Sequence, residues 1–101
     1  MIKLNFNFKL KDLDNNDIPD GEAAKIVSDT LAITKSSDTV KSWEYALVIR
    51  SKKFLELNST SDFDFLINII KSSENLLPLG KGQLILELTK QKDESLKEEK
   101  K

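Results

Sequence analysis

The residues with the clearest potential for chemistry are acidic and lie close together near the start of the chain. Asp12, Asp14 and Asn16 occupy the first, third and fifth positions of a calcium-binding loop. The pattern then fails, because Asp17 stands where the loop needs glycine and Ala23 where it needs a bidentate glutamate. Asp and Asn are also the residues that tight turns favour. We therefore interpret the segment as a solvated turn and expect no metal site.

The absence of histidine and cysteine limits the catalytic chemistry open to this chain. The sequence contains no histidine and no cysteine, which removes the commonest general base, thiolate nucleophiles, disulfides and the usual zinc ligands. The segment Gly-Lys-Gly-Gln at 80–83 does not complete a phosphate loop, because Gln83 replaces the required hydroxyl residue. We expect no catalytic residue and no cofactor. A magnesium-dependent enzyme using the acidic turn is the remaining catalytic alternative.

Basic side chains supply candidate contacts for a small anionic ligand. The four candidates are Arg50, Lys52, Lys53 and Lys81. Sixteen basic and seventeen acidic residues give a net charge of −1, whereas a protein that coats nucleic acid needs a net basic face. Nucleic acid is therefore an unlikely partner.

Aromatic side chains supply candidate contacts for a protein partner. The residues considered for an interface are Trp43, Tyr45, Phe6 and Phe8. Their spacing favours core positions over a binding surface, because aromatics at regular helical or strand spacing usually pack inside. Trp43 is the best interface candidate of the four, since a partly exposed tryptophan often anchors a protein contact.

The elements that would position these residues follow from hydrophobic periodicity. Unbroken alternation of apolar and polar residues from Ile2 to Lys11 predicts a strand with one wet face. A short returning strand before Pro19 is possible, and a helix is expected to open at Pro19 and Asp20. A second helix should follow the Asp38 cap, then a short strand at 54–58 and a third helix. An apolar loop at 76–80 precedes a fourth helix from Gly82.

These elements predict an α+β fold. A small two- or three-stranded antiparallel sheet, made from an N-terminal strand or hairpin plus strand 54–58, packs with about four helices in the order β(β)ααβαα. Residues 1–91 should form one compact domain. Residues 92–101 contain a single apolar residue, and so predict a charged tail or a solvent-exposed helix extension. Such a small sheet needs helices over it or a second subunit along its edge.

Neither a secretory signal nor an apolar stretch long enough to span a bilayer is evident. A cytoplasmic location without a membrane partner is the resulting expectation.

One resemblance covers most of the chain. The frame Phe-x-Leu-x-Asp-Leu-Asp-Asn-Asn-Asp-Ile at 8–18, the Trp-Glu-Tyr-Ala-Leu segment at 43–47 and the run 79–88 resemble small uncharacterised proteins of tailed phages and prophages. This sequence has Asn16 where such turns favour glycine. The resemblance implies a phage or mobile-element origin and a binding or assembly role, and it supplies no active-site residues.

The leading hypothesis is a non-enzymatic, oligomeric protein-interaction or assembly protein encoded by a phage or mobile element. The alternative is a protein that sequesters a small anionic ligand or nucleotide, in the manner of an anti-defence protein. A nucleic-acid-binding regulator is the third reading.

Overall fold

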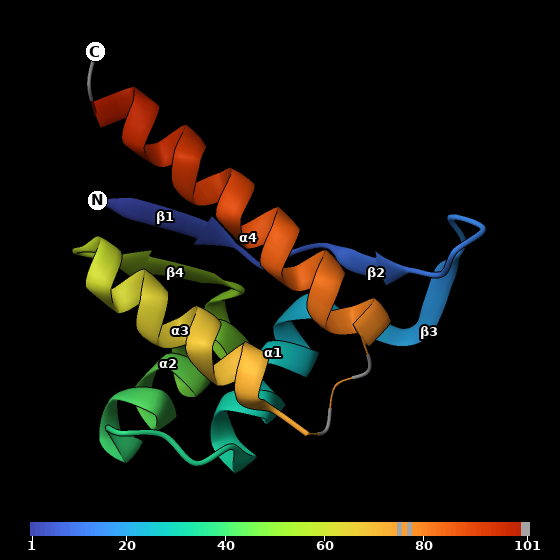
Figure 1. Cartoon of the computed structure of the whole chain (residues 1–101), viewed down its shortest axis with the longest axis horizontal. Coiled ribbons are helices and arrows are strands. Elements are labelled where there is room, and N and C mark those ends of the chain that lie inside the picture. Colours follow the sequence, from blue (N-terminus) through green and yellow to red (C-terminus); the bar gives the residue numbers. More distant parts are fainter. Residues whose placement is uncertain (75, 77, 100–101) are drawn as a thin grey trace.

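The computed structural model describes residues 1–74, 76 and 78–99. Within these residues the elements are β1 (Ile2–Asn5), β2 (Lys9–Lys11), β3 (Asp17–Glu22), α1 (Ala23–Ile33), α2 (Thr39–Lys52), β4 (Phe54–Leu57), α3 (Thr60–Ser72) and α4 (Pro78–Glu99). Figure 1 shows their arrangement. The predicted α+β class and the order of elements are confirmed.

The N-terminal alternating segment forms two strands in two different sheets. β1 pairs antiparallel with β4, with Leu4 opposite Leu55, and β2 pairs antiparallel with β3 as a hairpin. The break lies at residues 6–8, where the Phe6 amide donates to the Lys53 carbonyl and the Ala23 amide donates to the Phe8 carbonyl. The alternation predicted the buried face, but the single long strand that it indicated is wrong.

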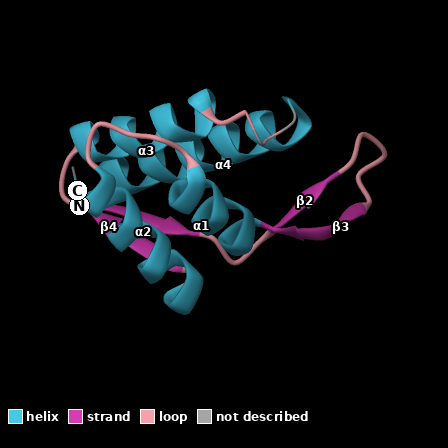
Figure 2. Ribbon diagram, turned by 90° about the horizontal axis from the view of Figure 1, so that it is seen from below, coloured by secondary structure: helices cyan, strands magenta, loops and turns pink. Residues whose placement is uncertain are grey.

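The hairpin projects from the body of the molecule, as Figure 2 shows. It includes Pro19 and Asp20, which the sequence placed at the start of the first helix; α1 begins instead at Ala23. Asp20 has a left-handed backbone with φ of 58°, which a helix cannot accommodate. The backbone of Gly21 packs closely against that of Ile18, so that a Cβ on residue 21 would lie 2.8 Å from the Ile18 carbonyl oxygen. The helix therefore begins only at Ala23, after this close contact.

Helices α2 and α3 begin at side-chain caps. The Asp38 carboxylate accepts the Lys41 amide at 3.0 Å, and the Ser59 hydroxyl accepts the Asp62 amide at 3.3 Å. Each cap satisfies a main-chain N–H group that would otherwise lack a helical partner. Lys53, in the left-handed region with φ of 56°, ends α2 and turns the chain directly into β4. The two elements therefore run side by side in opposite directions.

One hydrophobic core joins the β1–β4 sheet to all the helices. The strands bury one face, and α1, α3 and α4 each contribute an apolar stripe. The buried hydrophobic residues are Ile2, Leu4, Phe6, Leu10, Ala23, Ala24, Val27, Leu31, Ala46, Ile49, Leu55, Leu57, Phe63, Leu66, Ile67, Ile69, Ile70, Leu84 and Leu88.

Helix α4 begins earlier than the sequence indicated, and at its C-terminal end it follows the helical alternative for residues 92–99. It starts at Pro78, because proline fits the first turn, where its missing N–H has no helical acceptor. Leu77, expected in an apolar loop, lies outside the described residues. At the other end the helix continues to Glu99, and it carries a buried Ser95 and a half-buried Leu96. Lys100 and Lys101 of the expected tail also lie outside the described residues.

Candidate functional site

The outer edge of β1 is closed by side chains of α4. The Lys3 amide donates to the Ser95 hydroxyl at 3.1 Å. The Asn5 amide donates to the Gln91 carbonyl oxygen at 2.6 Å, and the Gln91 amide nitrogen donates back to the Asn5 carbonyl at 3.0 Å. A polar row on α4 thus takes the place of a neighbouring strand.

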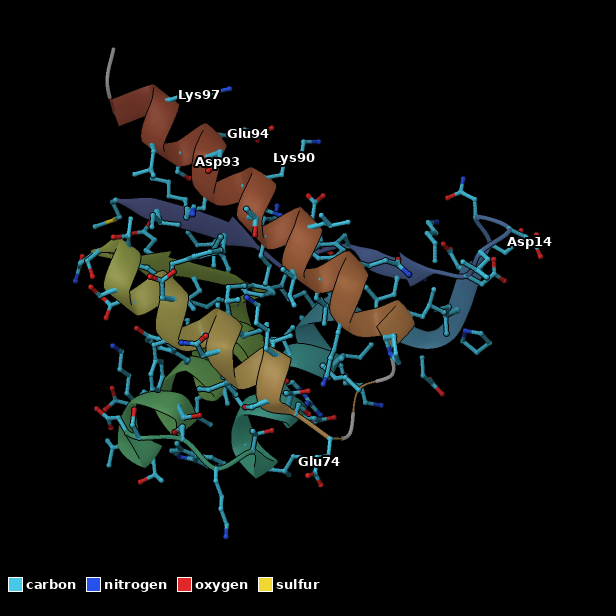
Figure 3. The ribbon with its side chains drawn as sticks, viewed as in Figure 1. Asp14, Glu74, Lys90, Asp93, Glu94 and Lys97 are labelled. Atoms are coloured by element: carbon cyan, nitrogen blue, oxygen red, sulfur yellow. The ribbon has the colours of Figure 1, made fainter. Side chains whose placement is uncertain are left out.

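The same row closes the edge of β2. The Lys11 amide donates to Gln83 Oε1 at 2.7 Å, and Gln83 Nε2 donates back to the Lys11 carbonyl. Gln83, Gln91 and Ser95 are separated by eight and four residues, a spacing that places them on one helix face. Figure 3 shows the other side of α4, where Lys90, Glu94 and Lys97 point away from the strands.

The outer edge of β4 is open. The Phe6 amide bonds the Lys53 carbonyl, so the even-numbered residues of β1 and the odd-numbered residues of β4 face each other in the ladder. The amides and carbonyls of Phe54 and Glu56 consequently point outward. Within the described part of the chain these groups make no hydrogen bond. Open strand edges are templates for the addition of another strand.

A groove runs beside this edge, between β4 and α2. Its volume is about 470 Å³, and it is lined by Glu44, Tyr45, Val48, Lys52, Phe54, Leu55 and Glu56. Tyr45, Val48 and Phe54 are half-buried and give the groove an apolar floor. Glu44, Lys52 and Glu56 are exposed, and they form no ion pair with any other described residue. The groove therefore combines main-chain hydrogen-bonding groups, apolar surface and unpaired charges.

Tyr45 is held in place at the groove by aromatic and charged neighbours. Its ring packs edge-on against Phe65 with centroids 6.1 Å apart, and the Lys41 ammonium lies 5.8 Å from its centroid. Burial raises the pKa of Tyr45 above its ordinary value. The phenol therefore stays neutral near neutral pH and can donate a hydrogen bond.

Lys41 forms an ion pair with Asp62 that joins α2 to α3 behind the groove. The hydrogen bond from Lys41 lowers the pKa of the Asp62 carboxyl below 3.8, and the same bond raises the pKa of the Lys41 ammonium above 10.5. The contribution of the pair to stability is full between these values. It is lost as pH falls through the lowered pKa of Asp62, and as pH rises through the raised pKa of Lys41.

We expect Asp62→Asn to lower the free energy of unfolding at pH 7 by less than about 1 kcal/mol, because the pair is partly exposed. The difference from the parent protein should shrink as pH falls below about 4, where the parent carboxylate also becomes neutral. Urea unfolding between pH 7 and pH 2 measures both. Asp64→Asn, at an exposed position of the same helix, is the control. A deficit that does not depend on pH would contradict a role for the Lys41–Asp62 pair.

The four aromatic interface candidates separate in the structure. Tyr45 lines the groove. Phe6 is 1% exposed and packs in the core, and Phe8 is half-buried near the base of the hairpin. Trp43 is 54% exposed, so its expected core position is wrong. It forms an exposed apolar row with Val40 and Leu47 on α2, on a different side of the helix from the groove residues.

The four basic candidates also separate. Arg50 bonds Asp29 at 2.8 Å and Ser28 at 3.0 Å. Lys52 lines the groove, and Lys53 lines a hollow beside Phe8. Lys81, on α4, donates to the Lys71 carbonyl of α3 at 2.9 Å. The structure does not bring these four residues together.

The acidic turn forms the tip of the hairpin. The Asp12 carboxylate accepts the amides of Asp14 and Asn16, each at 2.9 Å, and Lys11 pairs with Asp17. Figure 3 shows Asp14 pointing outward at this tip. Over residues 1–74, 76 and 78–99, no three carboxylates converge in a metal-binding arrangement. The carboxylate of Asp12 thus serves the turn itself, as the turn interpretation expects.

Sequence reasoning missed the open β4 edge. The strand itself was predicted, but which edge of a strand is covered depends on the tertiary position of α4. The recurrence of Gln83, Gln91 and Ser95 on one helix face was the available signal for the covered edges.

No described helix combines the length and apolar character needed to cross a membrane. Comparison with protein-family models, curated proteins and solved structures gives no match to this chain.

Proposed function

We propose that this chain is a non-enzymatic interaction protein that binds an extended polypeptide segment by adding it as a strand to β4. One observation carries the proposal: α4 closes the outer edges of β1 and β2, whereas the edge of β4 stays open beside a groove. In strand addition, main-chain hydrogen bonds supply affinity and side-chain pockets supply specificity. Phe54 and Glu56 offer the first, and the α2 side of the groove offers the second.

The residues lining the groove support binding over catalysis. Its ionisable residues are Glu44, Tyr45, Lys52 and Glu56. Of these, Tyr45 has a pKa that burial raises, which disfavours the charged form that would act as a base. A partner strand would instead cover the apolar floor and satisfy the exposed main-chain groups. An assembly role in a phage or mobile element, which the resemblance implies, agrees with such a surface and belongs to the same proposal.

The sequestering alternative receives less support. It requires several cations to converge on one anion, yet Arg50 is paired with Asp29 and Lys81 lies on another helix from Lys52. Regulation through nucleic acid has similarly little support, since the net charge is −1.

Backbone amide exchange tests the proposal directly. In protein diluted until it is monomeric, the amides of Phe54 and Glu56 should exchange quickly, because no described residue accepts a hydrogen bond from them. We expect added hexapeptides that alternate valine with lysine or glutamate to slow both, as judged by NMR on isotope-labelled protein. The amides of Lys3 and Asn5, already bonded to α4, are the internal control and should not change. Peptide-induced changes confined to other surfaces would contradict strand addition at β4.

A further inference from the structure

We propose that the segment filling the groove is β4 of a second copy of this chain, in a symmetric antiparallel dimer. This inference rests on the proposed function and names its partner. In a dimer with a two-fold axis, the same patch of each copy must complement itself. The groove meets this requirement in three ways: in the main-chain groups of β4, in the matching positions of residues along α2 and β4, and in the charges on α2.

The backbone groups of β4 are self-complementary. A two-fold axis through Leu55 places Phe54 of one copy opposite Glu56 of the other, and both residues point their amides and carbonyls outward. Residues that face each other in this way exchange both N–H···O bonds in an antiparallel ladder. Pairing β4 with its copy therefore satisfies the main-chain groups of Phe54 and Glu56 that have no partner among the described residues of one chain. The result is one continuous sheet running from β1 through both β4 strands to the second β1.

The two-fold axis through Leu55 also passes through the middle of the groove side of α2. Lys53 joins α2 to β4 by a tight turn, so position along each element can be counted from it. Val48 lies about 7.5 Å back along the helix at 1.5 Å per residue, and Leu55 about 6.6 Å along the strand at 3.3 Å per residue. The two residues are nearly level, and both line the groove. An axis through Leu55 therefore also passes at the level of Val48.

The charges on α2 match their symmetry-related copies. Glu44 precedes Val48 by four residues and Lys52 follows it by four, so they form one row on the groove side of the helix. A two-fold axis at Val48 sets Glu44 of each copy opposite Lys52 of the other when these rows pack antiparallel. Within one chain, eight residues of helix keep the two about 12 Å apart, so the dimer supplies each with an ion-pair partner that it lacks among the described residues of its own chain.

The covered edges explain why such pairing would stop at two copies. Once β4 is paired, the continuous sheet ends on both sides at β1. The outer edge of β1 is bonded to Gln91 and Ser95 of α4. With no open edge left in this sheet, the assembly closes as a dimer and does not extend into a fibre.

Charge exchange tests the helix contact. Sedimentation velocity across a concentration range should give a dimer for the parent protein. We expect Glu44→Lys and Lys52→Glu each to weaken dimerisation about tenfold or more, because each places like charges together. The double variant restores opposite pairs and should return to within about threefold of the parent, as an intermolecular pair requires. Lys25→Glu, a charge reversal at an exposed position of α1, is the matched control and should leave the dimer unchanged.

Removal of one main-chain donor tests the strand contact. Glu56→Pro deletes an outward amide for which the described residues offer no acceptor, and an edge position tolerates proline on its solvent side. We expect this variant to be monomeric while keeping the circular dichroism of the parent. Glu56→Ala, which keeps the amide, should still form the dimer. Equal loss in both variants would show that the strands do not pair.

Two results would overturn the inference without touching the proposed function. The first is a parent protein that stays monomeric at all concentrations, while peptides still slow exchange at Phe54 and Glu56. The second is a dimer that ignores the charge exchange and dissociates instead in Trp43→Ser, which would assign self-association to the row of Val40, Trp43 and Leu47. Failure of the proposed function looks different, because Phe54 and Glu56 would then gain protection neither from peptides nor from self-association.

Discussion

Replacing Leu88 by alanine is expected to lower the free energy of unfolding by about 2–5 kcal/mol, a large part of the stability of a domain this size. Leu88 is fully buried, on the inner face of α4. The variant loses the transfer free energy of the removed atoms, and the surrounding core relaxes only partly into the cavity. Urea unfolding followed by far-ultraviolet circular dichroism measures the effect.

Leu86→Ala is the matched control, because it removes the same atoms from the same helix. Leu86 is 75% exposed, so this variant should change stability by less than about 0.5 kcal/mol. The contrast tests whether α4 is part of the core. Equal and small effects in both variants would mean that α4 is only loosely attached and does not close the β1 edge.

Helix α4 shows what periodicity can and cannot predict. The apolar spacing of Leu84, Ile85 and Leu88 correctly indicated a helix with an inward face. The charged residues after position 91 indicated a tail or a helix leading into solvent, because composition alone does not show which polar groups have partners. Ser95 is buried and bonded to Lys3, ninety-two positions away in sequence. A contact of that separation is decided by tertiary packing and leaves no local signal.

The N-terminal segment shows a similar division. Alternation from Ile2 to Leu10 identified the buried side chains, since a period of two is a property of extended backbone. Alternation cannot distinguish one long strand from two strands that leave for different sheets, because both keep the same period. The division at residues 6–8 depends on the Lys53 carbonyl and the Ala23 amide, which lie far along the chain.

The candidate site was visible only in part. Tyr45 and Lys52 were named from the sequence, and both line the groove. Trp43 was expected to face the core, because Val40, Trp43, Ala46, Leu47 and Arg50 lie along one mainly apolar face of the helix. The helix instead buries Ser42, Ala46 and Ile49, whose small and branched side chains permit close packing against α1, where the Ser42 hydroxyl bonds the Leu31 carbonyl at 2.9 Å. Ala46 lies on the predicted face and is buried, whereas Trp43 and Leu47 of that face are exposed, because close packing against α1 decided which side chains turned inward.

Removing the α4 side chains that close the β1 edge should both destabilise the protein and change its association. In Gln91→Ala with Ser95→Ala, Lys3 and Asn5 lose their partners on α4. We expect a loss of about 1.5–4.5 kcal/mol, at about 0.5–1.5 kcal/mol for each of these three net hydrogen bonds. We also expect species larger than a dimer, because the sheet would then present open edges at β1 as well as at β4. Urea unfolding and sedimentation velocity measure the two effects.

Lys90→Ala with Glu94→Ala is the control for this variant, because each position directly precedes one of the altered residues. Lys90 and Glu94 lie on the outer face of α4 (Figure 3), away from β1. This control should match the parent in stability and in sedimentation, although it also shortens two polar side chains of the same helix. If both double variants stayed at the size of the parent, the α4 side chains would not be what limits strand pairing. Strand pairing at β1 would then be prevented by the helix itself, which covers the β1 edge whatever side chains it carries. Comparing stability with size therefore separates hydrogen bonding at the edge from simple steric cover.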